Sequence, residues 1–165
     1  MKFNLFSIVI IIVIIYVICY FIFPSYVLIL ETSITDFNFS QLTSRQPLII
    51  TDFLKDAKPL IESWFKYNII TQIPEIEIKE ENKEWEYNKY KYLFVKAKKN
   101  TEVIIHKASV YKNPPTEEDR IIAIKLKENQ SLIIPYRWKY FIKTKEEVEI
   151  WGIDDYITFF VGLVF

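Results

Sequence analysis

Glycine, cysteine and histidine are scarce in this sequence of 165 residues, and their scarcity excludes several kinds of site. The two glycines, Gly152 and Gly162, cannot supply the glycine-rich loops that bind dinucleotides or phosphates. The single cysteine, Cys19, excludes a disulfide within the chain and a zinc site built from cysteines. The single histidine, His106, excludes a metal site that needs two imidazoles. No catalytic residue and no cofactor is therefore predicted.

Charged residues are absent from one long stretch near the N-terminus, Leu5 to Leu30. This apolar run has 26 residues, whereas a helix needs roughly 20 to cross a bilayer. Secretory signal peptides have a shorter apolar region of about 7 to 15 residues, and this run ends among bulky side chains, so an uncleaved anchor fits better. The sequence predicts a transmembrane helix with the anchor residues Leu5, Phe6, Ile10, Ile14, Tyr20, Phe23 and Pro24.

The charges on either side of the run indicate its orientation. Lys2 lies before the run, and acidic residues precede the first basic residue after it, Arg45. The positive-inside tendency therefore places the N-terminus in the cytosol. We divide the chain into an anchor (1–30), a juxtamembrane loop that serves as linker (31–46) and one β-domain (47–165), because the remainder is too short for two ordinary domains. Basic and acidic residues are equal at 21 each, so no nucleic-acid partner is expected.

Alternation of side chains along the domain indicates its secondary structure. The β-branched run Pro47–Thr51 predicts a buried strand, and helical spacing after Asp56 predicts a helix over residues 57–67. Further on, residues two apart share a face, which is typical of strands. The strands predicted from this pattern cover residues 73–78, 90–97, 102–110, 120–127, 131–134, 138–144, 147–153 and 156–165. Many short strands after one helix predict an antiparallel sandwich or barrel.

Two segments carry a resemblance to a known family. Ser131–Ile142, where a strand rises to Pro135 and turns among aromatic residues, resembles the second conserved box of cupin-like and JmjC-like domains. Gln46–Lys55, followed by Trp64, is similar to the entry segment of the JmjC-like group. Together these segments frame residues 46–165. The resemblance implies a mainly β, cupin-like domain, a double-stranded β-helix or jelly roll, with one leading helix.

The iron ligands of that family are not matched in this chain. Its catalytic members hold Fe(II) with a His-x-Asp or His-x-Glu pair on one strand and a distant histidine. The corresponding family-box positions here are His106, Ala108, Pro135, Trp138 and Tyr140, and Arg137 stands where the family has a turn glycine. Alternation allows both His106 and Tyr140 to point inward, but a methyl group cannot ligate iron and a neutral tyrosine is a poor substitute for imidazole. The resemblance thus implies the barrel scaffold with its iron chemistry lost.

Surface features of the domain suggest contacts with other proteins. Aromatic side chains exceed what a small core needs, and we expect an interface that includes Trp85, Tyr90, Tyr92 and Trp151. The lysines among residues 89–99 are interpreted as a solvated edge strand rather than a site for single-stranded nucleic acid. Asn38 and Asn129 begin glycosylation sequons, which matter only if the domain enters a secretory lumen.

The sequence therefore favours a non-catalytic, single-pass membrane protein that displays a cupin-like binding domain. Such a protein resembles the small virion membrane proteins of large DNA viruses, which implies a structural role that links an internal membrane to capsid proteins and leaves homo-oligomers open. Two alternatives remain. A membrane-tethered Fe(II)/2-oxoglutarate oxygenase would need carboxylates such as Glu102 or Asp119 to converge on His106. A lumenal domain would bind a small ligand inside the barrel.

Overall fold

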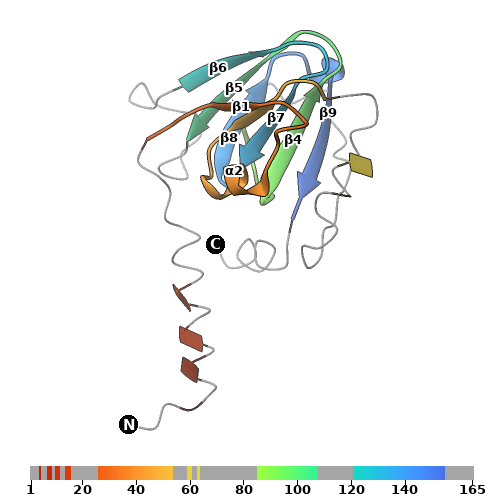
Figure 1. Cartoon of the computed structure of the whole chain (residues 1–165). Coiled ribbons are helices and arrows are strands. Elements are labelled where there is room, and N and C mark those ends of the chain that lie inside the picture. Colours follow the sequence, from red (N-terminus) through yellow and green to blue (C-terminus); the bar gives the residue numbers. More distant parts are fainter. Residues whose placement is uncertain are drawn as a thin grey trace.

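The computed structural model of the chain describes residues 26–53, 85–107 and 121–154, together with residues 4, 7, 8, 10, 11, 14, 15, 59, 60 and 63. This part of the chain is mainly β and forms two sheets, accompanied by the short helix α2 (Phe39–Thr43) and the 3-10 turn η1 (Lys145–Glu147) (Figure 1). The strands are β1 (Leu30–Thr32), β2 (Leu48–Ile50), β3 (Glu86–Tyr87), β4 (Tyr92–Ala97), β5 (Thr101–Lys107), β6 (Ile121–Leu126), β7 (Ser131–Pro135), β8 (Trp138–Ile142) and β9 (Val148–Ile153).

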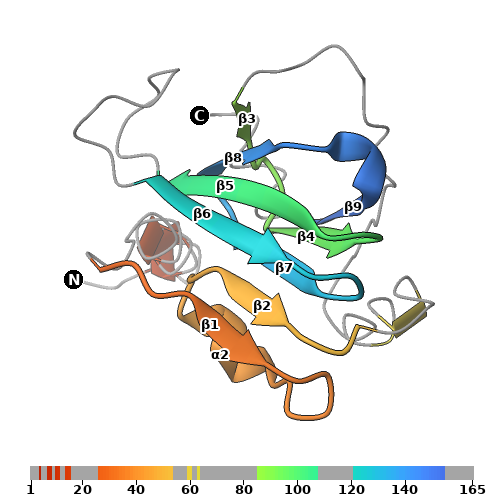
Figure 2. The same ribbon diagram turned by 90° about the horizontal axis from the view of Figure 1, so that it is seen from above.

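From β2 onward, successive strands lie in alternate sheets, except that β5 and β6 are neighbours in the same sheet. The first sheet has the order β1-β2-β7-β4-β9, and the second has the order β3-β8-β5-β6. Every pairing is antiparallel except β1 with β2. The β5–β6 pair is nested in sequence inside the β4–β7 pair, and β8 and β9 then add to β5 and β4 respectively. The two layers lie face to face (Figure 2).

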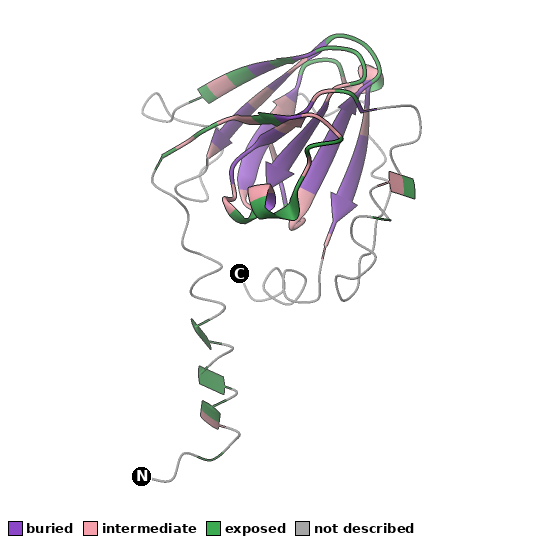
Figure 3. Cartoon of the chain, in the orientation of Figure 1, coloured by how far each residue is buried: buried purple, intermediate pink, exposed green. Residues whose placement is uncertain are grey.

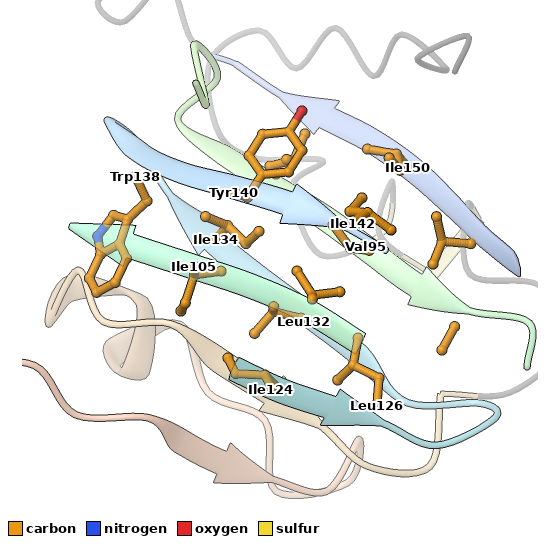
Figure 4. Close-up of a cluster of buried hydrophobic side chains, with 14 residues drawn as sticks. Val95, Ile105, Ile124, Leu126, Leu132, Ile134, Trp138, Tyr140, Ile142 and Ile150 are labelled. Atoms are coloured by element: carbon orange, nitrogen blue, oxygen red, sulfur yellow. The ribbon is translucent and has the colours of Figure 1, made fainter. Parts of the chain in front are cut away.

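The core lies between these sheets and follows the two-residue period of the strands. On β4, Leu93, Val95 and Ala97 point into this interior and are fully buried. Side chains from β5, β6, β7, β8 and β9 complete the cluster, and Figure 4 shows them meeting between the two layers. The predicted alternation of residues 90–97 is confirmed for β4, because Tyr92 and Phe94 lie on the opposite face.

A second apolar layer covers the outer face of the first sheet. Phe94, Ile133 and Trp151 project from β4, β7 and β9 into this layer, where they pack with Leu42 of α2 and with Phe53. Figure 3 shows that the strands of this sheet are largely buried. Trp151 is only 5% exposed, so our prediction that it belongs to a surface interface is wrong.

Residues 31–46 are not the loop that we predicted. β1 pairs in parallel with β2, and α2 packs on the first sheet through Leu42. A capping box begins α2: the Asn38 side chain accepts a hydrogen bond from the Ser40 amide, and the Gln41 side chain accepts one from the Asn38 amide. This segment is therefore part of the folded unit, because Leu42 is buried and Ile34 and Phe37 pack against the same layer, contacts that its polar composition concealed.

The other sequence predictions differ in outcome. Strands predicted at 47–51, 90–97, 102–110, 120–127, 131–134, 138–144 and 147–153 are confirmed as β2 and β4 to β9, with ends shifted by a few residues. The strands predicted at 73–78 and 156–165 lie outside the described residues, as does most of the helix predicted at 57–67. β4 is a central strand rather than an edge, and Lys96 on it is buried, so the solvated-edge interpretation is wrong there.

The predicted membrane anchor lies mostly outside the described residues. Its last residues are described and are not helical: Val27 and Ile29 pack against the interior cluster and Leu30 begins β1, so the predicted end of the anchor at residue 30 is wrong. Ile10 and Ile14 are described, and both are helical and exposed. Within the described residues, no helix has the length and apolar character that a membrane span requires.

Gly152 on β9 is needed because the Tyr90 ring occupies the space beside it. A Cβ atom at position 152 would lie 2.5 Å from Cδ1 of Tyr90. We expect Gly152→Ala to lower the free energy of unfolding by about 1–3 kcal/mol, the usual cost of overpacking, measured by chemical denaturation with tryptophan fluorescence. The same substitution in a Tyr90→Ala background should cost much less. Equal losses in both backgrounds would contradict this contact.

Candidate functional site

Three polar side chains meet where β3 pairs with β8. Glu86 lies opposite Tyr140 in this antiparallel pair. The Tyr140 hydroxyl donates a hydrogen bond of 2.7 Å to Oε2 of Glu86, and the Lys145 ammonium from η1 forms an ion pair with Oε1 of the same carboxylate. We call these residues the Glu86–Tyr140–Lys145 cluster. It joins β3, β8 and η1 at the margin of the apolar interior.

Burial governs the electrostatics of this cluster. Tyr140 is 5% exposed, and its ring packs in the interior cluster (Figure 4). Burial raises the pKa of Tyr140 well above its ordinary value, and the hydrogen bond to Glu86 and the charge of Glu86 raise this pKa further. The Glu86 and Lys145 side chains are themselves largely covered, at 33% and 14% exposed. Tyr140 therefore keeps its proton and acts as a hydrogen-bond donor.

The cluster is suited to holding strands together. Both carboxylate oxygens of Glu86 are engaged, one by a hydroxyl donor and the other by an ammonium group. A phenol with a raised pKa is neither a base nor an activated nucleophile at neutral pH. The three groups thus form a partly buried polar contact that joins distant segments of the chain.

Asn88 positions the turn between β7 and β8. Its side-chain amide donates hydrogen bonds to the carbonyl oxygens of Ile134 (2.8 Å) and Pro135 (2.9 Å), and its Oδ1 accepts one from the Tyr90 amide (2.9 Å). Its backbone amide donates to the carbonyl oxygen of Trp138, and its own carbonyl accepts from the Arg137 amide. Asn88 is 1% exposed, so these bonds satisfy a side chain that would otherwise be costly to bury.

The turn that Asn88 holds contains one residue with a strained backbone, Arg137. Arg137 has φ 67°, in the left-handed region that favours glycine. The resembled family has its turn glycine at this position. Pro135 ends β7, and Trp138, which is 1% exposed, begins β8 in the interior.

His106 does not point into the interior, so our prediction for its direction is wrong. In the pairing of β5 with β8, Ile105 lies opposite Tyr140 and His106 lies opposite Lys139. His106 is therefore on the outer face of the second sheet, where its ring lies 6.0 Å from the Trp85 ring, and it is 2% exposed. Alternation tells which residues share a face but not which face is inside. Ala108 lies outside the described residues.

The carboxylates that the oxygenase alternative requires do not gather around His106 in the described structure. Glu102 lies four residues away on β5, about 13 Å along an extended strand, and it pairs with Lys143 at 3.3 Å. Asp119 lies outside the described residues. Among the described residues, no group of three His, Cys, Asp or Glu side chains could hold a metal ion.

The aromatic residues predicted as an interface do not share one face. Trp85 packs beside His106 and Phe141 on the second sheet, with ring centroids 6.0 and 6.2 Å apart. Tyr92 packs against the outer layer of the first sheet, and Tyr90 packs against the interior cluster. These side chains mainly cover the sheets.

Sequence reasoning did not identify the Glu86–Tyr140–Lys145 cluster or the role of Asn88. Glu86 is separated from Tyr140 by 54 residues and from Lys145 by 59. No local spacing connects such residues, and Glu86 also ends an acidic run that resembles an ordinary solvated surface. Comparisons of the chain with protein-family models, with curated proteins and with solved structures found no match.

The Tyr140–Glu86 hydrogen bond should contribute to stability in a pH-dependent way. We expect Tyr140→Phe to lower the free energy of unfolding at pH 7 by about 1.5–3 kcal/mol, the range for hydrogen bonds to charged groups. The folded-state pKa of Tyr140 is raised above its unfolded value of about 10. Above about pH 10 the unfolded state loses this proton while the folded state retains it. The free energy of unfolding therefore falls as the pH rises above about 10.

Denaturation curves measured from pH 7 to alkaline pH test this expectation. The stability of the wild type should fall more steeply above about pH 10 than that of Tyr140→Phe, by at most about 1.4 kcal/mol per pH unit. Tyr26→Phe is the matched control, because Tyr26 is 60% exposed. Parallel curves for the wild type and Tyr140→Phe would refute the assignment.

Proposed function

We propose that this chain is a membrane-anchored, non-catalytic protein whose cupin-like domain binds partner proteins beside the membrane. The packed interior carries the proposal: fully buried apolar side chains fill the space between the sheets. At the family-box position predicted for the distant histidine, Tyr140 donates a hydrogen bond to Glu86. This arrangement favours a domain that acts through its surface.

The strand order supports the cupin-like assignment. In a jelly roll, nested antiparallel strand pairs are wound so that successive strands alternate between two sheets. The pairs β5–β6 and β4–β7 are nested in this way, and β3 and β9 extend the same pattern beside β8 and β4.

The connection between the apolar run and the domain supports an anchoring role. Gln46 is 2% exposed, and its side chain bonds the backbone of Tyr26 and Leu28. The chain then enters β1, which pairs with β2. A pulling force on the anchor would therefore act directly on the first sheet, because no flexible linker separates Tyr26 from β1.

The expected partners are capsid-type structural proteins, and the expected location is an internal virion membrane. This part of the proposal is supported by the resemblance to small virion membrane proteins and by a residue usage rich in Ile, Lys and Asn and poor in Gly, which is typical of A/T-rich genomes. Such a protein would link the membrane, held by the anchor, to the capsid shell, held by the domain.

The anchor can be tested in the full chain by placing charge in the apolar run. We expect Ile10→Lys with Ile14→Lys to reduce carbonate-resistant membrane association strongly, because each lysine in a membrane helix costs up to about 2.5–3.5 kcal/mol. Ile10→Leu with Ile14→Leu is the matched control and should behave like the wild type. Unchanged association of the lysine variant would exclude a spanning helix at these residues.

Cross-linking in the native membrane or particle tests the structural role. Exposed lysines such as Lys89, Lys98 and Lys99 should link reproducibly to other structural proteins, and mass spectrometry would identify the contact face. Links found only within this chain or between its copies would contradict a bridging function and favour a self-contained domain.

A further inference from the structure

We propose that the end of the domain nearest the apolar run binds the headgroups of anionic lipids, an inference that rests on the proposed membrane anchor. Because anionic lipids face the cytosol, the inference places the domain on the cytosolic side, the reverse of the orientation that Lys2 alone predicts. We call this end of the domain the anchor-proximal end. Near the apolar run it includes the contact of Gln46 with Tyr26 and Leu28. It also includes the segment Asn88–Lys91 before β4, the Tyr136–Arg137 turn, the last residue of β5 (Lys107) and the first residue of β6 (Ile121). The described N-terminal helical residues lie beyond this end, toward which the arrowheads of β7 and β9 point (Figure 1).

The Gln46 contact leaves little chain between the domain and the run. The Leu28 amide donates a hydrogen bond of 3.0 Å to Oε1 of Gln46, and Nε2 of Gln46 donates one of 3.1 Å to the carbonyl oxygen of Tyr26. The Leu30 amide then donates to the carbonyl oxygen of Pro47 (2.9 Å). Tyr26 belongs to the apolar run but is not helical. A membrane helix formed by the earlier residues of the run would therefore end close to Tyr26 and bring the anchor-proximal end to the membrane surface.

Exposed apolar side chains gather at this end. In the described residues from 26 onward, the exposed large apolar residues are Tyr26, Leu28, Phe39 and Ile121, which are 40–60% exposed. Tyr26 and Leu28 flank the Gln46 contact, Ile121 lies opposite His106 at the end of β5, and Phe39 begins α2 at the same end in Figure 1. Such a distribution fits a headgroup region, which accepts apolar side chains that water disfavours.

Charge is distributed unevenly between the two ends. The basic residues of the anchor-proximal end are Arg45, Lys89, Lys91, Lys107 and Arg137, whereas Asp154 is the acid that the described residues place there. At the opposite end, acids accompany the lysines, as in the Lys98–Glu149 and Lys143–Glu102 ion pairs, each at 3.3 Å. Among the described residues, which leave out 108–120 and 155–165, the end that would face lipid is thus the more basic one.

The basic groups stand beside aromatic rings on a rigid support. The guanidinium of Arg137 lies 5.5 Å from the Tyr136 ring, and the Lys91 ammonium lies 5.9 Å from the Tyr92 ring. Backbone bonds from Tyr136 to Lys91 and from Arg137 to Asn88 hold these segments together. Tyr136 is 8% exposed, so its ring supports Arg137 from within, and the cationic groups are the ones that would meet a membrane surface carrying phosphate and carboxylate headgroups. Anionic lipid therefore fits this end better than an acidic protein, because the anchor brings lipid to it.

Lysine accessibility in lipid nanodiscs tests the proposal with the full chain. Discs of phosphatidylcholine alone would be compared with discs containing about 30% phosphatidylserine. We expect acetylation of Lys89 and Lys91 to slow by roughly threefold or more in the anionic discs and to recover in high salt. Lys98 and Lys99, at the opposite end, are internal controls whose rates should not change.

Two variants separate the lipid contact from general charge effects. Phosphatidylserine should raise the Tm of the wild type and of Lys99→Gln with Lys127→Gln, but not that of Lys89→Gln with Lys91→Gln. Equal acetylation of Lys89 and Lys91 in both discs, or an equal Tm rise in both double variants, would overturn this inference alone. Failure of the wild-type chain to co-elute with the discs would overturn the proposed anchor and this inference with it.

Discussion

Leu93 and Val95 on β4 meet Val103 and Ile105 on β5 in the interior, and the burial of such side chains from both sheets holds the molecule together. Each fully buried aliphatic side chain contributes about 1.5–3 kcal/mol, more than a typical hydrogen bond, which contributes about 1 kcal/mol. The nested strand pairs are stable because they bring these apolar faces together. The outer layer formed by α2 and residues 30–53 depends on the same first sheet, whose opposite face it covers.

Buried and partly buried polar side chains secure the connections that apolar packing leaves undetermined. Asn88 fastens the start of β4 to the β7–β8 turn, Gln46 fastens the chain at Tyr26 to the domain, and Glu86 joins β3 to Tyr140 and Lys145. Each replaces water contacts with bonds to a distant segment, so losing one partner would leave the other buried without compensation. These residues determine how segments far apart in sequence are joined, which apolar burial alone does not specify.

The two ends of the domain differ in chemistry in the part of the chain that the structure describes. At the entry end, exposed apolar side chains lie among basic residues, whereas at the opposite end the lysines and glutamates form ion pairs. A membrane helix directly coupled to the first sheet would expose these ends to different surroundings. In the proposed role, one end would meet headgroups and the remaining surface would be available to structural partners.

The sequence by itself determined the alternation of β4 to β9 and the apolar run near the N-terminus, because these depend on local spacing and composition. Tertiary structure decided which face is inside. It placed Tyr140 in the interior and His106 outside, buried Trp151, and made β1 and α2 part of the folded unit. The contacts of Glu86 with Tyr140 and Lys145 could not be predicted, because pairing across more than fifty residues depends on strand order and register, which no local pattern encodes.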